Sequence, residues 1–294
     1  MSEKIYIFDT TLRDGEQSAG VAFTPQEKVE IARQLEKLGV DIIEAGFPCS
    51  TPGDLEAVGA VAREVRGASI AALARAVRTD IDTAWEAVKG AADPRIHVFI
   101  NTSDIQMAHQ LNKDREQVLT QAEEMVKYAA KYTSNVEFSP MDATRADPRF
   151  VIEIVRRCID AGATTINIPD SVGYAIPEEL AFLFQSVFEH VPNIHKARVS
   201  FHGQNDLGLC TANTLTAIQN GARQVEVTVN GIGERAGNTS LEEVVMAIKT
   251  RKDFFGFHTD VNTREIYRAS KLVERYSGMP VQWNKAIVGK NAFR

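Results

Sequence analysis

The 294-residue sequence predicts an α/β protein that folds as a closed (β/α)8 TIM barrel with a short C-terminal helical extension. Eight short apolar or β-branched runs recur along the chain, helical patterns separate them, and polar residues collect at their carboxyl ends. Strands that alternate with helices through short connections indicate a parallel sheet. Eight such units fit a closed barrel of roughly 250 residues better than any other architecture.

The eight expected strands are short segments in which β-branched and other apolar residues dominate. In chain order they are residues 4–10, 40–47, 69–74, 95–101, 135–142, 164–171, 198–204 and 223–230. An open, doubly wound sheet is the main alternative for such an alternation. The barrel is favoured because polar residues lie in or at the carboxyl halves of the strands, which a barrel gathers at one mouth. These residues are Asp9, Glu44, His97, Ser139, Asp142, Asn167, Asp170, His202, Gln204 and Asn230.

The helical segments between the strands carry start and stop signals. Residues 24–39 begin with a threonine that can cap the helix, followed by a proline at the first helical position. Residues 240–250 open with a Ser-x-x-Glu capping box. Gly39, Gly162 and Gly221 stand where helices are expected to end.

Two regions follow from this pattern. Residues 1–251 form the barrel, and a further helical pattern in 263–278 places a helical extension in residues 252–294. The sequence contains no internal repeat and no low-complexity linker between them.

Composition excludes several classes of function. The net charge is −6, and the basic residues are scattered rather than gathered into the stripe that binding to a phosphate backbone needs. No apolar run approaches the roughly 20 residues that span a bilayer. The first nine residues, "MSEKIYIFD", lack the plan of a signal peptide. We therefore expect a cytoplasmic protein with no nucleic-acid or membrane partner.

Two motifs at expected strand ends point to chemistry. "FDTTLRDGEQ" (8–17) places Arg13 beside Asp14 in a loop, where the aspartate could bind a cation and the guanidinium a carboxylate or carbonyl oxygen; the alternative is a turn with a solvated ion pair. In "VSFHGQNDLG" (199–208) His202 and Gln204 share one face of a strand. A histidine in that position often holds a metal, whereas glutamine is a less usual partner.

The string "NGIGERAGN" (230–238) satisfies the G-x-G-x-x-G/A pattern of dinucleotide-binding loops. Its context argues against that function, because the next helix is expected to begin near Ser240, too late for the glycines to present its N-terminus to a pyrophosphate. A loop above the barrel mouth that offers Arg235 and Asn238 to a substrate or metal is the better interpretation. His97 is either a core histidine or part of the same site.

The sequence resembles the catalytic barrel of 2-isopropylmalate synthase. The strings that carry the resemblance, in this order, are "FDTTLRDGEQ", "LGVDIIEAGFP…PGD", "GATTINIPDSVGY", "NDLG" and "NGIGERAGN…LEEVVMAI". They cover nearly every strand-loop junction. The same superfamily includes homocitrate synthase, citramalate synthase and hydroxymethylglutaryl-CoA lyase, and "IEAGFP…PGD" and "GERAGN" favour isopropylmalate synthase among them.

The resemblance implies a Claisen-type condensation of acetyl-CoA with a 2-keto acid, 2-oxoisovalerate in leucine biosynthesis. It implies a divalent metal (Mn, Mg or Zn) that polarises the ketone, with Asp14, His202 and Asn238 as its ligands. Arg13 matches the catalytic group that steadies the developing oxyanion. The lining of the keto-acid pocket is matched by His97, Ser139, Asn167, Pro169 and Ser171.

The chain departs from the family's pattern at several site positions. Gln204 stands where the second metal histidine of the family's H-x-H-N-D string belongs, so we expect the metal to bind weakly. Met141 in "FSPMDATRAD" stands where the family has an active-site glutamate. In "SDIQMAHQLN", Gln106, Ala108 and Asn112 replace ionisable groups beside the barrel mouth.

The same resemblance bears on the end of the chain. Residues 252–294 are expected to be the truncated start of the helical extension, ending before the segment that in the family gives a histidine to the partner subunit's active site. No regulatory domain is expected in this chain, and a homodimer stays open.

Two functional hypotheses follow. The chain is a 2-isopropylmalate synthase barrel with reduced activity, or it is a barrel of the same ancestry, natural or redesigned, that binds a ligand without turnover. A synthase that uses a different 2-keto acid is a variant of the first.

Overall fold

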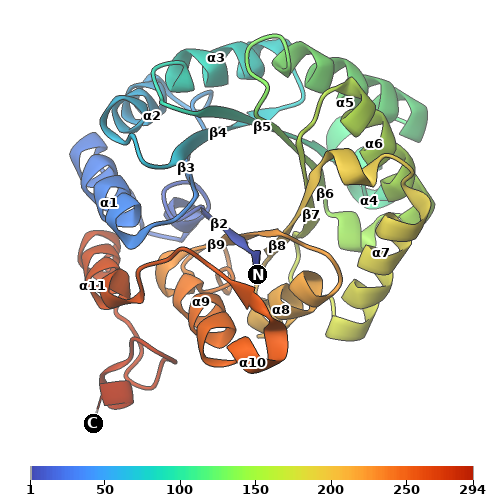
Figure 1. The fold of residues 1–294 in the computed structure, drawn as a ribbon. Coiled ribbons are helices and arrows are strands. Elements are labelled where there is room, and N and C mark those ends of the chain that lie inside the picture. The colour runs from blue at the N-terminus through green and yellow to red at the C-terminus, as the bar shows by residue number, and fades with distance from the viewer. Residues whose placement is uncertain (1, 294) are drawn as a thin grey trace.

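The computed structural model describes residues 2–293, and these form the predicted closed barrel of parallel strands (Figure 1). The barrel strands neighbour one another in chain order: β2 (Tyr6–Asp9), β3 (Ile42–Gly46), β4 (Ser69–Arg75), β5 (Pro94–Asn101), β6 (Val136–Met141), β7 (Thr165–Asp170), β8 (Arg198–Gly203) and β9 (Gln224–Val227). β9 pairs with β2 in parallel and closes the ring. The open-sheet alternative is therefore wrong.

The helices surround this barrel (Figure 1). They are α1 (Pro25–Leu38), α2 (Pro52–Glu64), α3 (Arg78–Val88), α4 (Asp104–Gln106), α5 (Arg115–Ala129), α6 (Pro148–Ala161), α7 (Pro177–His190), α8 (Cys210–Gln219), α9 (Leu241–Thr250), α10 (Lys252–Phe255) and α11 (Ile266–Ser277). No helix among residues 2–293 combines the length and apolar character that crossing a membrane requires.

The predicted helix signals are mostly present. Thr24 forms a complete capping box at the start of α1, and Gly39 and Gly162 end their helices with left-handed backbone at φ 82° and 117°. The capping box expected at the start of α9 is wrong. The Ser240 side chain makes no cap hydrogen bond there and instead accepts one from Nζ of Lys285 at 2.7 Å.

The first expected strand is divided in the structure. Only Tyr6–Asp9 joins the barrel, while the preceding residues form β1 (Glu3–Lys4), which pairs in parallel with β10 (Phe257–His258). After β10 the chain continues into α11, which packs beside α1. The helical pattern of residues 263–278 thus corresponds to a helix on the outside of the barrel (Figure 1).

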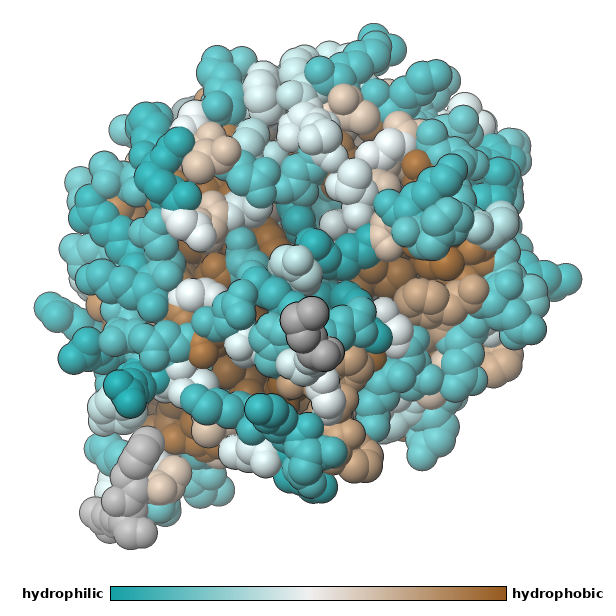
Figure 2. All heavy atoms as spheres, viewed as in Figure 1, coloured by the Kyte–Doolittle hydropathy of each residue, from teal (hydrophilic) through white to brown (hydrophobic). Residues whose placement is uncertain are grey.

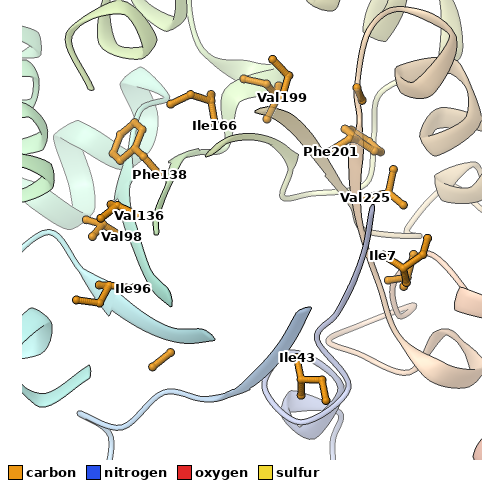
Figure 3. Packing of buried hydrophobic residues seen from close by; sticks show 14 of the residues in the cluster. Ile7, Ile43, Ile96, Val98, Val136, Phe138, Ile166, Val199, Phe201 and Val225 are labelled. Carbon is orange, nitrogen blue, oxygen red and sulfur yellow. The ribbon is translucent and has the colours of Figure 1, made fainter. Parts of the chain in front are cut away.

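Side chains alternate between two environments along each strand, and this alternation builds the site. Apolar residues such as Ile43, Val98 and Phe138 point outward and pack under the helices (Figure 3). Their neighbours along the strands, Glu44 and His97 among them, are also buried and lie in the barrel interior. The sequence therefore places a buried polar cluster inside a layer of apolar side chains, and hydrophilic residues cover much of the face shown in Figure 2.

Candidate active site at the barrel mouth

A cavity of about 210 Å³ lies at the carboxyl ends of the strands. Its lining brings together side chains from almost every barrel strand and from the loops that follow them. The lining residues are Arg13, Asp14, Gln17, Phe47, Leu73, His97, Phe99, Ser139, Met141, Asn167, Pro169, Ser171, His202, Gln204, Glu226 and Glu234. Of the catalytic, pocket and metal residues that the resemblance implies, only Asn238 is missing from this set. Asn238 lies against it, because its backbone forms a bridge with that of Gln204.

Glu44 stands at the centre of the first half of the site. Its Oε2 accepts hydrogen bonds from Nε of Arg13 at 2.6 Å and from the Thr10 hydroxyl at 2.7 Å, while its Oε1 lies 2.7 Å from Nδ1 of His97. Burial alone would raise the pKa of Glu44, but the charges of Arg13 and His97 outweigh burial and lower it. Glu44 is thus an ionised carboxylate that fixes two cationic side chains.

His97 is held between acids and is charged at neutral pH. Burial lowers its pKa, but the carboxylates of Glu44 and Glu137 raise it more, to about 9. The imidazolium donates from Nδ1 to Glu44 and from Nε2 to the Ser139 hydroxyl, at 2.7 Å each. His97 is therefore no inert core histidine, because its charge is set by the site around it.

Ser139 receives a second hydrogen bond, from Nδ2 of Asn167 at 2.9 Å. With both acceptor positions used, its hydroxyl hydrogen is free to donate into the cavity that Ser139 lines. Oδ1 of Asn167 is buried and has no hydrogen-bond partner among the described residues. This pair offers one donor and one acceptor to a small polar ligand.

The second half of the site joins Asp14, His202 and Gln204. Nδ1 of His202 donates to Glu226 at 2.8 Å, which turns Nε2 toward Oδ2 of Asp14, 3.4 Å away. Burial is the largest influence on the pKa of Asp14 and raises it, yet the charges of Arg13 and His202 leave that pKa below its usual value. Asp14 is an ionised carboxylate beside an imidazole.

The Gln204 amide fills the space where a second imidazole is expected. Its Nε2 donates to Oδ2 of Asp14 at 3.2 Å and also lies 3.2 Å from Nε2 of His202, so the amide stands between two of the expected metal ligands. Three buried oxygens around it have no partner among the described residues: Oδ1 of Asp14, Oε1 of Gln204 and Oδ1 of Asn238. Orphaned acceptors of this kind suit a cation.

These residues fit a hard divalent cation better than zinc. Carboxylate and amide oxygens are ligands that Mg²⁺ and Mn²⁺ accept, and half a turn of the Gln204 amide would bring its oxygen to the place its nitrogen holds. One imidazole and no thiolate make a poor zinc site. The same amide nitrogen occupies the space between Asp14 and His202, so a metal that binds there has to displace it.

A second group of metal-ligating type shares two residues, His97 and Glu226, with the lining of this cavity. Ligand atoms of His97, Glu137 and Glu226 all lie within 4.8 Å of one another, and this buried group could hold a metal ion. Sequence reasoning missed Glu137 and Glu226, although each occupies an inward position of its strand. Glu137 is already bonded to Arg95 at 2.7 Å, so a metal there would compete with existing contacts.

The remaining wall of the cavity is apolar. Phe47 and Phe99 meet with ring centroids 6.4 Å apart, and Leu73 and Met141 complete this side. Phe47, Leu73 and Phe99 were not expected in the site, because their sequence pattern is that of ordinary core residues. Met141 supplies a thioether where an acid was expected and cannot exchange a proton.

Two other expectations concern loops. Ser171 lines the cavity, but its hydroxyl accepts a hydrogen bond from the backbone of Asp142 at 2.9 Å. Gln106 accepts one from Asn101 at 3.1 Å. Ala108 lies in the π-helix Met107–Leu111 that follows α4, and Asn112 is its C-cap; none of the three is among the cavity's lining residues.

The loop of residues 230–238 covers the mouth as expected. α9 begins at Leu241 with Ser240 as its N-cap, so the glycines do not open the helix and the dinucleotide interpretation stays excluded. Arg235 connects this loop to the loops after β7 and β8, because its guanidinium donates to Asp206 at 2.7 Å and to the backbone oxygen of Ser171 at 2.8 Å.

Comparisons with known proteins agree with this architecture. A family model described as HMGL-like matches residues 4–273. The 2-isopropylmalate synthase of Syntrophus aciditrophicus (strain SB) is 61% identical over 99% of this chain and 56% of its own length. That of Pyrococcus furiosus is 58% identical over 100% of this chain and 59% of its own length. The chain thus spans little more than half the length of these curated relatives.

Solved structures are similar at the level of the fold. The hydroxymethylglutaryl-CoA lyase of Pseudomonas aeruginosa superposes with a TM-score of 0.80 at 21% identity, covering 96% of this chain and 95% of the lyase. The carboxyl transferase domain of Rhizobium etli pyruvate carboxylase gives 0.72 at 17% identity, covering 94% of this chain and 48% of its own.

Proposed function

The chain belongs to the HMGL-like family, and from this we propose that it is a 2-isopropylmalate synthase-type barrel that binds a 2-oxo acid at its mouth and condenses it slowly with acetyl-CoA. The observation that carries the proposal is the cluster of Arg13, His97, Ser139 and Asn167 around one cavity of about 210 Å³. That volume suits a ligand of 2-oxo-acid size.

The polar half of the cavity suits the carboxylate and ketone of such a ligand. The Ser139 hydroxyl, positioned by the His97 imidazolium, donates toward a ligand oxygen. Arg13 is anchored through Nε to Glu44 and through Nη1 to Asp14, and its remaining N–H groups can stabilise negative charge that develops on the ketone oxygen. The apolar wall receives the aliphatic chain.

Asp14, His202, Asn238 and the Gln204 carbonyl would hold the divalent cation, Mg²⁺ or Mn²⁺ in preference to Zn²⁺. When bound, such a cation supplies Lewis-acid polarisation of the ketone. In the absence of a cation, the Gln204 amide occupies the expected metal position, between Asp14 and His202.

Two residues make low turnover part of the proposal. Met141 lines the cavity but can neither accept nor donate a proton. Gln204 is neutral and replaces an imidazole. These two positions also support the second candidate function, a barrel that binds the 2-oxo acid without turning it over. A synthase that acts on a different 2-oxo acid is the third candidate.

The test compares binding with turnover. Calorimetric titration with 2-oxoisovalerate, and separately thiol release from acetyl-CoA in the presence of Mg²⁺ or Mn²⁺, should give measurable binding and slow release. Arg13→Gln should abolish release, while Arg149→Gln, which changes an exposed arginine on α6, should not. Binding without release favours the second candidate. Absence of binding with any small 2-oxo acid would refute both.

The proposal includes a cytoplasmic location, acetyl-CoA as cosubstrate and a homodimeric assembly. Size-exclusion chromatography with light scattering tests the assembly, and a monomer would remove it from the proposal.

A further inference from the structure

We propose that a cavity at the opposite, amino-terminal end of the barrel binds an oxyanion, a carboxylate or a phosphate, through the guanidinium of Arg198. The cavity measures about 790 Å³ and is formed where the chain enters the strands. β1 lies at this end, near the N-terminus marked in Figure 1. The lining residues are Lys4, Tyr6, Gly39, Val40, Asp41, Ile42, Arg66, Gly67, Ala68, Ser69, Asp93, Arg95, Ser134, Asn135, Thr164, Thr165, Arg198 and Asp260.

Arg198 is held by the face of its guanidinium and not by its edges. It is the first residue of β8, and its guanidinium carbon lies 3.5 Å from the ring centroid of Tyr6. Stacking on an aromatic ring uses the flat face of the group, so its five N–H donors stay in the plane around it. Within residues 2–293, no oxygen accepts a hydrogen bond from those donors. The group is fixed in position with its donors unused.

The other basic side chains of the cavity are engaged. Nζ of Lys4 pairs with Asp41 at 2.6 Å and with Asp260. Nη1 of Arg66 donates to the backbone oxygen of Gly90 at 2.8 Å, and Nη1 of Arg95 donates to Glu137 at 2.7 Å. Lys4 and Arg95 thus have acidic partners and Arg66 is held by backbone oxygens, whereas Arg198 is the basic side chain of this lining with no hydrogen-bond partner among residues 2–293.

The acids of the lining do not supply the missing partner. Lys4 binds both Asp41 and Asp260, and Asp93 accepts hydrogen bonds from Nδ2 of Asn135 at 3.1 Å and from the Ser69 hydroxyl. Asp93 is exposed at the rim, where water screens it. An anion that approaches Arg198 thus meets carboxylates whose charge is compensated or solvated.

Electrostatics favours an anionic occupant. Burial is the largest influence on the pKa of Arg198 and lowers it, and the like charge of Arg95 adds to this, while the carboxylates of Glu137 and Asp41 offset only part of the shift; a guanidinium nevertheless stays protonated at neutral pH. A partly buried charge without a counter-ion is unfavourable, and an oxyanion relieves that cost. Carboxylate and phosphate both match the guanidinium edge with two parallel hydrogen bonds.

The experiment titrates the parent protein with inorganic phosphate and, separately, with succinate, at ionic strength held constant with sodium chloride. Calorimetry and thermal-shift measurements should detect binding of at least one of them. Arg198→Gln should weaken anion binding about tenfold or more. Arg198→Lys keeps the charge but loses the paired N–H donors of the guanidinium, so its affinity should lie between those of the parent and Arg198→Gln. Arg149→Gln, an exposed arginine elsewhere, is the matched control.

The anion that binds identifies the source of the ligand, a phosphoryl compound or a carboxylic acid. Succinate could also bind in the cavity at the carboxyl-terminal mouth. Binding at that site would be unchanged in Arg198→Gln, which distinguishes it from binding at Arg198. On the parent protein, the same anion should slow modification of Arg198 by phenylglyoxal, read by peptide mass mapping. If neither anion binds, or if both Arg198 variants bind as the parent does, the proposal is wrong. These outcomes are independent of activity at the carboxyl mouth.

Discussion

Nδ1 of His97 lies 2.7 Å from Oε1 of Glu44, and both side chains are buried inside the barrel. A salt bridge of this kind is costly to bury, and it persists here because the other polar atom of each side chain also has partners: Arg13 and Thr10 on Oε2 of Glu44, and Ser139 on Nε2 of His97. The charge of His97 therefore depends on Glu44, and this dependence has a measurable consequence for stability.

The first prediction concerns pH. The pKa of His97 is raised from 6.5 to about 9 in the folded protein, so its contribution is complete below pH 6.5 and is lost as pH rises through 9. The shift corresponds to about 3 kcal/mol at most. Urea unfolding at pH 6, 8 and 9.5 should show the parent losing stability relative to His97→Gln across this window. Parallel curves for the two proteins would contradict the assignment of charge to His97.

The second prediction concerns a buried acid outside the site. Burial raises the pKa of Asp9 from 3.8 to about 7, so the folded protein prefers the neutral acid and loses stability as pH rises from 4 through 7. Asp9→Asn should therefore unfold at a higher temperature than the parent at pH 8, with the advantage absent at pH 4. The full shift is about 4 kcal/mol, and relaxation of the site will reduce the measured gain. Equal effects at both pH values would show that Asp9 stays ionised, held by Thr11.

Metal binding is the subject of the third prediction. With one imidazole exchanged for an amide, the parent should bind Mn²⁺ weakly and Zn²⁺ no better, and Gln204→His should improve Zn²⁺ affinity at least about tenfold. Isothermal titration of both proteins, with His202→Ala as the control that removes the remaining imidazole, gives the answer. Tight binding by the parent that disappears in His202→Ala would mean that Gln204 is an adequate ligand.

The fourth prediction pairs the two altered positions. Gln204→His and Met141→Glu should each restore little condensation, and together they should restore more than the product of their separate effects. Both groups serve one transition state, and such groups are non-additive. Thiol release from acetyl-CoA with 2-oxoisovalerate and Mg²⁺ or Mn²⁺ is compared for the parent, both single variants and the double variant. A parent as fast as the double variant would make Gln204 and Met141 working parts of a different site.

Much of the fold and part of the site follow from patterns in the sequence. Alternation along strands places Glu44, His97 and Asn167 inward, and the resemblance supplies Asp14 and His202. What the sequence could not predict is how a side chain is used once it is there. The Ser240 hydroxyl is taken by Lys285, which arrives from 45 residues away, and the Gln204 amide turns its hydrogens toward Asp14. Glu137 and Glu226 were missed because their partners lie on other strands, far away in the sequence, which no local pattern reports.

The pairing of β2 with β9 also sets the order in which a growing chain can fold. β2 is complete at Asp9, but one of its two neighbours does not exist until Val227 has been synthesised. Until then the nascent sheet is open, and its first strand presents unpaired backbone groups to any other strand nearby. β1 can pair only later still, because its partner strand β10 ends at His258. The ring of strands therefore cannot close, and β2 cannot gain its second neighbour, before residues 224–227 have been synthesised.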